Sequence, residues 1–328
     1  MRNLITDVAG LKVGHADDAT LGSGTTAIVF DEPAVASSDL RGGGPGTRET
    51  ELLSATSTVE RIDAITLSGG SAFGLDAASG AQAWLREQGR GFAVQTARVP
   101  IVPGAIIFDL LAGGNKNWER FPPYRELGYL ACAEASDDFA LGSVGAGMGA
   151  TVATLKGGVG SASAKTKDGL TVGALVVVNA VGSVTIGNGP HFWAAPFERN
   201  GEFGDRGWPQ SLGPDDLAIH LKGAGRQATT IALVATDAIL TVVQAHRLAV
   251  MAQTGCARAI YPVHTPLDGD VVFSAATGKK PLADPLISLT TLGSLAANVL
   301  ARAIARGVYK ATALPFDGAL PSWQDKFT

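Results

Sequence analysis

The amino-acid sequence predicts a mixed α/β protein whose core is shared by both halves of the chain. Two stretches of strand length lie at residues 61–67 and 173–182, and the second is almost wholly apolar. Strand and helix patterns alternate again after residue 229. The third observation is glycine, which supplies 42 of 328 residues, well above the average usage of about 7%. These glycines gather where strands meet helices, which indicates tight turns and close backbone approach.

The first half of the chain contains two clear strand signals. Residues 61–67 predict a strand, and Gly69 and Gly70 turn it into a helix whose alanines permit close packing. Residues 173–182 predict a second strand with one asparagine, Asn179, inside an apolar run. Because a buried amide needs hydrogen-bond partners, Asn179 is a candidate for a structural or a chemical role.

The second half predicts a strand, a helix, two strands and a long final helix. Thr241 is a candidate N-cap for the first helix and Gly255 a candidate end. Asp284 and Pro285 form the N-cap and N1 pair that starts the last helix. Residues 314–318 predict a surface tail.

Composition and charge restrict the expected partners. A formal net charge of −4 and a pI of about 5.7 supply no basic field, so no nucleic-acid partner is expected. Cys132 and Cys256 lack metal-ligand spacing, so we expect reduced thiols and no metal or other cofactor. The amino terminus has no apolar signal core, and no run of about 18 apolar residues was found. We expect a soluble, cytoplasmic protein with no membrane partner.

The polar-to-apolar junction at Thr229 is the first candidate for chemistry. A turn-rich connection precedes it and an apolar strand follows. A cut between Ala228 and Thr229 would place a free α-amine beside the hydroxyl of the same residue, the pairing used by amino-terminal threonine nucleophiles. An α-amine titrates near ~7.7–8.0, so a modest shift lets it accept the hydroxyl proton near neutral pH. The alternative is that Thr229 merely begins a β-branched strand.

Ordered motifs over most of the chain strengthen the first interpretation. They lie at residues 39–50, 67–75, 145–151, 229–238 and 262–270. Together they resemble the L-aminopeptidase/D-Ala-esterase/amidase family, which also contains the β-aminopeptidases and the nylon-oligomer hydrolase. The resemblance runs from residue 10 to about residue 310. It covers nearly the whole chain.

The resemblance implies a self-processed hydrolase of the N-terminal-nucleophile kind with a four-layer αββα fold. One domain would then consist of two fragments, residues 1–228 and residues 229–328, with Thr229 opening the second. The family usually has Asn or Gly before the cut, whereas this chain has Ala228. Because Gly and Asn tolerate positive φ better than Ala, a cut that needs such a backbone would be slow or absent here.

Two aspartates and a lysine are the next candidates. Asp268 and Asp270 flank a glycine, which alone indicates a hairpin turn. The resemblance to the nylon-oligomer hydrolase implies that both orient the new amine of Thr229. Because a carboxylate favours the ammonium form, a nearby cation is needed to keep the amine basic. Lys156 is our candidate for that cation, although lysines in loops are usually solvated. The family often has a second lysine here, and Thr154 aligns with it.

Asn179 is the candidate oxyanion donor, a role typically worth ~10²–10³ in rate. The substrate pocket is expected to include Met148, Gly147, Ser71 and Glu49. Residues 145–150 formally match a dinucleotide-binding pattern but lack the preceding strand and the later acidic residue, so we interpret them as a pocket loop. The substrate's own amine would be bound by a carboxylate such as Glu49 or Asp137, between which the sequence does not choose.

Two other functions remain open at this point. Ser71, on the turn after the first strand, is the nucleophile of a rival serine hydrolase, but a nucleophile elbow requires glycine where Phe73 stands. His191, His220 and His264 are among its possible partners. The third reading is a relative that never cuts itself and binds small molecules without catalysis, a possibility that Ala228 keeps open.

The predicted function is therefore an aminopeptidase, amidase or esterase. It would act on amino-terminal amide bonds of small peptides or ω-amino-acid amides through Thr229. The family resemblance also implies a homo-oligomer, with a tetramer favoured.

Overall fold

The computed structural model describes residues 1–223 and 227–328. Its α-helices and strands follow one another along the chain as β1 Leu11–Asp18, β2 Ser23–Leu40, β3 Thr47–Arg48, β4 Arg61–Ser68, α1 Ala77–Glu87, β5 Phe92–Val94, β6 Ala97–Val99, β7 Gly104–Ile106, α2 Tyr124–Ala133, β8 Gly158–Lys165, β9 Thr171–Asn179, β10 Thr229–Ala238, α3 Val242–Ala257, β11 Val271–Lys280, α4 Pro285–Tyr309 and α5 Trp323–Phe327. Short β5 and β6 form a separate hairpin.

Strand β2 connects two sheets because it is long and bends. Its first part pairs with β1 on one edge and β4 on the other, and its last part, residues 35–40, pairs with β11. The register with β4 shifts between Val29 and Ala34, which marks the bend. The first sheet continues through β4, β7 and β3, and the second through β11, β10, β9 and β8.

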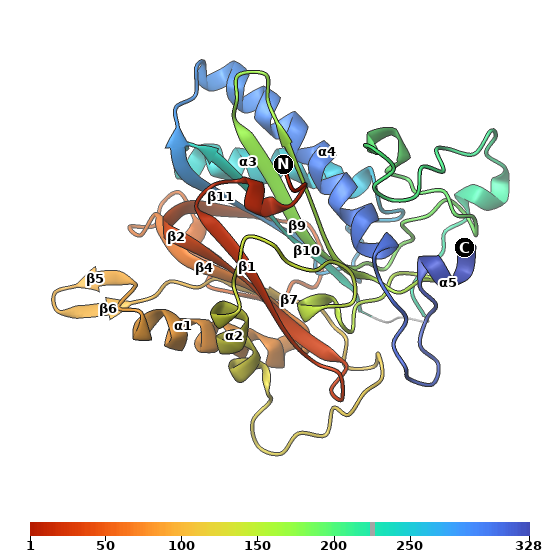
Figure 1. Cartoon of the computed structure of the whole chain (residues 1–328), viewed down its shortest axis with the longest axis horizontal. Coiled ribbons are helices and arrows are strands. Elements are labelled where there is room, and N and C mark those ends of the chain that lie inside the picture. The colour runs from red at the N-terminus through yellow and green to blue at the C-terminus, as the bar shows by residue number, and fades with distance from the viewer. Residues whose placement is uncertain (224–226) are drawn as a thin grey trace.

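Three apolar cores separate four layers. One core lies between the first sheet and helices α1 and α2, a second between the two sheets, and a third between the second sheet and helices α3 and α4. Figure 1 shows α1 and α2 below the strands and α3 and α4 above them. The predicted four-layer αββα architecture is confirmed.

Helix α4 is a core helix. By length and mean hydropathy it is long and apolar enough to cross a bilayer, and 61% of its most apolar window is buried inside the molecule. It packs along β8, β9 and α3 through residues such as Leu292 and Leu300. The predicted start at Asp284 and Pro285 is confirmed, since the Asp284 carboxylate accepts hydrogen bonds from the backbone N–H groups of Leu286 and Ile287.

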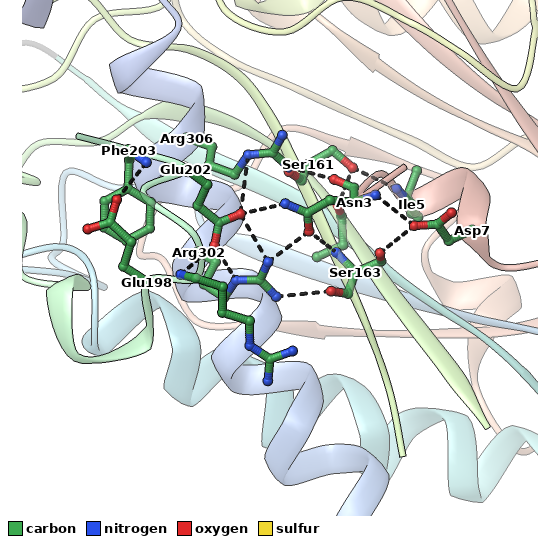
Figure 2. Close-up of polar contacts among 12 residues, drawn as sticks. Asn3, Ile5, Asp7, Ser161, Ser163, Glu198, Glu202, Phe203, Arg302 and Arg306 are labelled. Atoms are coloured by element: carbon green, nitrogen blue, oxygen red, sulfur yellow. Dashed lines mark hydrogen bonds and ion pairs between the residues drawn. The ribbon is translucent and has the colours of Figure 1, made fainter. Parts of the chain in front are cut away.

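A buried polar network fastens the amino terminus to α4 (Figure 2). The Glu202 carboxylate accepts hydrogen bonds from Arg302 Nε at 2.5 Å and Asn3 Nδ2 at 2.5 Å. Arg302 also donates to Asn3 Oδ1 at 2.7 Å and to the Ser163 carbonyl at 2.9 Å. Arg306 contacts the same carboxylate at 3.5 Å. Four segments far apart in the sequence therefore meet at one buried ion pair.

One expectation about the second half was wrong. No strand lies between α3 and β11 in the described chain, where Tyr261 makes a single bridge to Ser183 and Pro262 has no N–H to extend it. Residues 314–318 lie at the surface as predicted, since none of them is buried, and Asp317 and Gly318 line a cavity. Trp323 of the following α5 is buried. Trp323 stacks on Phe192 with ring centroids 5.7 Å apart, a tertiary contact that no local pattern announces.

Candidate active site

Thr229 begins β10 at the end of the core between the two sheets. Its partner across the antiparallel ladder is Asn179, the last residue of β9. The odd-numbered residues that follow on β10, Ile231 and Leu233, belong to the core between the sheets. Successive strand residues alternate faces, and directly opposed residues point to the same face with Cβ atoms about 4.5–5.5 Å apart. Thr229 and Asn179 therefore present their side chains side by side.

The peptide bond before Thr229 is held by hydrogen bonds on both sides. The Ala228 carbonyl oxygen accepts a hydrogen bond from the Gly269 N–H at 2.9 Å and one from the Thr229 hydroxyl at 2.5 Å. The Ala228 N–H donates to the Leu267 carbonyl at 3.1 Å. Thr229 itself is only 4% exposed. A hydroxyl and a backbone donor thus converge on one buried carbonyl.

Gly269 leaves the space that the Thr229 side chain occupies. A Cβ atom at position 269 would lie 2.8 Å from Thr229 Oγ1 and 2.6 Å from the Gly44 carbonyl oxygen. Both contacts are shorter than side chains tolerate. The loop of residues 41–44 also crosses here, since the Gly44 N–H donates to the Asp268 carbonyl at 2.8 Å. Glycine at 269 is thus required because the Thr229 side chain and a neighbouring backbone approach it closely.

Asp268 and Asp270 lie on the opposite face of the sheet from the Thr229 hydroxyl. Alternation from Gly269, whose absent side chain points at Thr229, places both carboxylates on the side of α3. Asp270 accepts hydrogen bonds from the Thr230 N–H at 2.7 Å and from His264 Nδ1 at 2.8 Å. Burial, together with the charge of Asp270, raises the pKa of Asp268.

The Asp268 carboxylate organises backbone around the site. It accepts hydrogen bonds from the Val181 N–H at 3.1 Å and from the Thr265 N–H and hydroxyl at 2.9 and 2.8 Å. The described bonds of Asp270 therefore hold the backbone at Thr230, whereas those of Asp268 hold the backbone at Val181 and Thr265. Their expected bond to a free amine stays a prediction.

Asn179 is fully buried and its amide is fixed from several sides. Its Oδ1 accepts hydrogen bonds from the Thr151 N–H at 3.0 Å and from Lys222 Nζ at 2.5 Å. Its Nδ2 donates to the Phe108 carbonyl at 3.3 Å. The amide that the sequence singled out is therefore satisfied, as a buried amide must be.

Lys156 is buried, not solvated. Its ammonium donates to the carbonyls of Gly147 and Gly157, each at 2.8 Å. Burial, and then the charge of Lys222, lower the pKa of Lys156 to about 7, while Asp109 acts in the opposite direction. The backbone of Lys156 forms an isolated β-bridge with that of Thr151, and the Thr151 N–H donates to Asn179 Oδ1. The backbone therefore connects Lys156 to the site.

A cavity of about 420 Å³ opens beside these groups. Phe108, Thr151 and Lys222, which all contact Asn179, lie in its wall together with Asp109 and Gln227. Its size fits a small-molecule substrate. Asp109 is buried and accepts hydrogen bonds from the Gly70 N–H at 2.7 Å and a serine hydroxyl at 2.6 Å, and burial raises its pKa.

Sequence reasoning missed Lys222 and Asp109. Lys222 falls in a turn-rich segment that indicated an exposed connection, and Asp109 belongs to no motif. Both are buried because other segments fold over them. Lys222 lies 68 positions after Thr154, the position that aligns with the family's second lysine. No local signal announces such a pairing.

The four predicted pocket residues lie outside the cavity wall. Gly147 and Met148 form the turn whose carbonyl holds Lys156. Ser71 has a positive φ of 52° and donates its N–H to the Ile107 carbonyl. Glu49, also with a positive φ, has one buried carboxylate oxygen without a partner among the described residues. Their roles in substrate binding stay predictions.

Comparison with known proteins decides the family. The chain matches Peptidase family S58 over residues 3–319. The protein belongs to peptidase family S58. An uncharacterized aminopeptidase of Mycobacterium tuberculosis is 43% identical to this S58 chain over 346 residues, an alignment that covers 99% of the chain and 98% of that protein.

Two further relatives extend this S58 assignment. The 6-aminohexanoate-oligomer endohydrolase of Kocuria sp. is 26% identical over 315 residues, covering 90% of the chain and 82% of that enzyme. The solved structure of the L-aminopeptidase D-Ala-esterase/amidase from Ochrobactrum anthropi has a TM-score of 0.74 at 20% identity and covers 99% and 92% of the two chains. It is described as a variant of the Ntn hydrolase fold. The S58 protein is a peptide or amide hydrolase, and its fold is that of the Ntn hydrolases.

Proposed function

We propose that this S58 hydrolase cuts itself between Ala228 and Thr229, and that Thr229 is the nucleophile of the mature enzyme. The products would be residues 1–228 and residues 229–328, which remain parts of one fold. The observation that carries the proposal is the Ala228 carbonyl, which meets the Gly269 N–H at 2.9 Å and the Thr229 hydroxyl at 2.5 Å. The attacked group, the attacking group and a donor for the developing charge are already together.

The chemistry is an N-to-O acyl shift followed by hydrolysis. Thr229 Oγ attacks the Ala228 carbonyl carbon, and the oxygen that gains charge receives the hydrogen bond of Gly269. The C–N bond breaks, the nitrogen takes the hydroxyl proton, and an ester joins Ala228 to Thr229 Oγ. Water then attacks the ester, which leaves a carboxylate on Ala228 and a free amine on Thr229. No redox partner or cofactor enters the balance.

Ala228 supports the reaction better than its sequence context suggested. The described non-glycine residues with positive φ do not include Ala228. Its backbone instead forms a parallel bridge with Asp268, an extended arrangement open to any residue. Asn or Gly is therefore not needed at this position for conformational reasons, and the expected slow cut loses its physical basis.

Turnover would reuse the same positions. The ester of self-processing and the acyl-enzyme formed from substrate are the same linkage, R–CO–Oγ on Thr229. The acyl half of a substrate therefore takes the place of Ala228, and its amine lies near the Leu267 carbonyl that now accepts the Ala228 N–H. The α-amine of Thr229 takes and returns the proton. Asn179 and Gly269 stabilise the oxyanion.

The substrates that fit are amino-terminal amides of small peptides or ω-amino-acid amides. An aminopeptidase name among the relatives and a cavity of about 420 Å³ beside Gln227, two residues before the nucleophile, support this class. In this proposal Asp268 and Asp270 hold the strand start and the new amine, and Lys156 supplies a balancing charge. A homo-oligomer, with a tetramer favoured, and a cytoplasmic location belong to the same proposal.

Intact-protein mass spectrometry under denaturing conditions tests the cut directly. We expect two fragments, the smaller beginning at Thr229 by amino-terminal sequencing. The Thr229→Ala protein should remain one chain and be inactive on an amino-acid 4-nitroanilide. A single full-length chain in the unchanged protein, still uncut after Ala228→Asn, would support the non-cleaving alternative. Loss of hydrolysis in Ser71→Ala but not in Thr229→Ala would support the serine hydrolase.

A further inference from the structure

Lys222 lies between the cavity and the amide of Asn179. It is only 7% exposed, and its Nζ donates to Asn179 Oδ1 at 2.5 Å and to the Thr151 carbonyl at 3.1 Å. Its own N–H donates to the Val181 carbonyl at 2.9 Å, which anchors the backbone. The lysine also forms part of the cavity wall. A buried ammonium at such a place must be matched by specific acceptors.

We propose that Lys222 is a positioning residue that orients and polarises the Asn179 amide for oxyanion stabilisation. This inference rests on the proposed reaction at Thr229 and adds a group to it that touches neither the nucleophile nor the reacting carbonyl. Lys222 acts through Asn179.

The orientation follows from the hydrogen-bonding chemistry of the two groups. An ammonium has three donors and no acceptor, so the amide atom in contact with Lys222 must be the oxygen. The Thr151 N–H fixes the same atom. The amide nitrogen of Asn179 therefore points away from Lys222. One of its hydrogens goes to Phe108, and we assign the second to the oxyanion formed at neighbouring Thr229.

The charge of Lys222 strengthens the donor that it positions. A cation bonded to an amide oxygen draws electron density from the amide, so the N–H groups become better donors, because hydrogen bonds in a chain polarise one another. The positive charge itself lies close to where negative charge develops, and a site shielded from water increases its effect. Lys156 and Asp109 are near enough to interact electrostatically with the same ammonium.

The arrangement survives the proposed cut. Lys222 belongs to the first fragment, six positions before Ala228, and its backbone bond to Val181 is within that fragment. Cutting after Ala228 does not remove this anchor. The first fragment would therefore contribute one lysine to a catalytic group whose nucleophile is in the second.

Kinetics of the cut enzyme test the inference. In Lys222→Met we expect kcat on an amino-acid 4-nitroanilide to fall about 10- to 100-fold, as for a slightly misplaced catalytic group, while KM changes far less. Lys116→Met is the matched control. Lys116 is a partly buried lysine that donates to the Gly113 carbonyl and interacts with Asp109, yet it does not contact Asn179. Its kcat should stay close to that of the unchanged enzyme.

A double-mutant cycle identifies the route of the effect. If Lys222 acts through the amide, Lys222→Met should cost little more in an Asn179→Ala background, so the two losses are not additive. Fully additive losses, or an unchanged kcat in Lys222→Met, would overturn the proposal. If Lys222→Met does not fold, Lys222→Gln replaces it in the same cycle. Two results distinguish a failure of this inference from a failure of the proposed nucleophile. If Thr229 is the nucleophile, the unchanged protein yields a fragment that begins at Thr229, and the Thr229→Ala protein is inactive.

Discussion

Gly269 shows how one residue type constrains the proposed reaction at Thr229. The Gly269→Ala change would place a methyl group 2.8 Å from Thr229 Oγ1, so the hydroxyl or the adjacent loop must move. We expect self-cleavage and kcat to fall by about 100-fold, the order of loss for a reacting group displaced by about 1 Å. Time-resolved mass spectrometry of freshly purified protein measures the cut, and steady-state kinetics measure turnover.

Gly189→Ala is the control for Gly269→Ala. A Cβ atom at position 189 meets its nearest neighbour at 3.5 Å, an ordinary contact. This protein should cut and turn over at the normal rate. Equal rates in both variants would mean that the Thr229 hydroxyl does not need the space beside Gly269.

The lowered pKa of Lys156 predicts that the stability of the protein depends on pH. The pKa of this lysine is lowered from the ordinary value of 10.5 to about 7, first by burial. Between these two values the unfolded chain binds one more proton than the folded chain. The contribution of Lys156 to the free energy of unfolding therefore rises with pH from about 7 to 10.5. Below that window the destabilisation caused by burying the charged lysine is fully present. Urea unfolding at pH 7 and pH 9.5 measures the rise.

The Lys156→Met protein should lose that part of the rise, because methionine does not titrate. Lys12→Met removes an exposed lysine from β1 and serves as the control. If the unchanged protein and Lys156→Met show the same change in urea midpoint between the two pH values, Lys156 does not titrate in this window.

At the scale of the element, signals in consecutive residues predicted helix starts well. The N-cap of α3 at Thr241 is confirmed, including its bond from the Gln244 N–H, because capping is decided within one turn. The sequence predicted which segments form strands, but not which side of the sheet each side chain faces. Both faces of β9 and β10 are buried, so their sequences are continuous apolar runs without alternation. The sequence therefore could not tell that Thr229 and Asp270 point to opposite sides.

At the scale of the whole molecule, the network of Figure 2 connects the two proposed fragments. Asn3 and Glu202 lie in the first and Arg302 in the second, and the Arg302 and Glu202 side chains are at most 7% exposed. Burial raises the pKa of Glu202, but Arg302, Asn3 and Arg306 together outweigh this and the pKa is lowered. We expect Arg302→Met to lower the free energy of unfolding by about 3–5 kcal/mol, since it leaves a buried charge unpaired.

Urea unfolding of the protein, with size-exclusion chromatography to detect separation of the two proposed fragments, measures this effect. Asp137→Asn is the control, because its ion pair with Arg2 is about half exposed and such pairs contribute only about 0–1 kcal/mol. A midpoint for Arg302→Met as high as that of the control would show that the buried pair does not hold the fragments together.

The sequence by itself determined the mixed α/β class, the caps of the long helices and the candidate residues Thr229, Asn179 and Lys156. These features depend on neighbouring residues or on short motifs. Only the tertiary structure decided that Lys222 meets Asn179 and that Gly269 donates to the Ala228 carbonyl. Such contacts join residues 40 or more positions apart, and their partners are selected by how strands and loops pack, which no local pattern records.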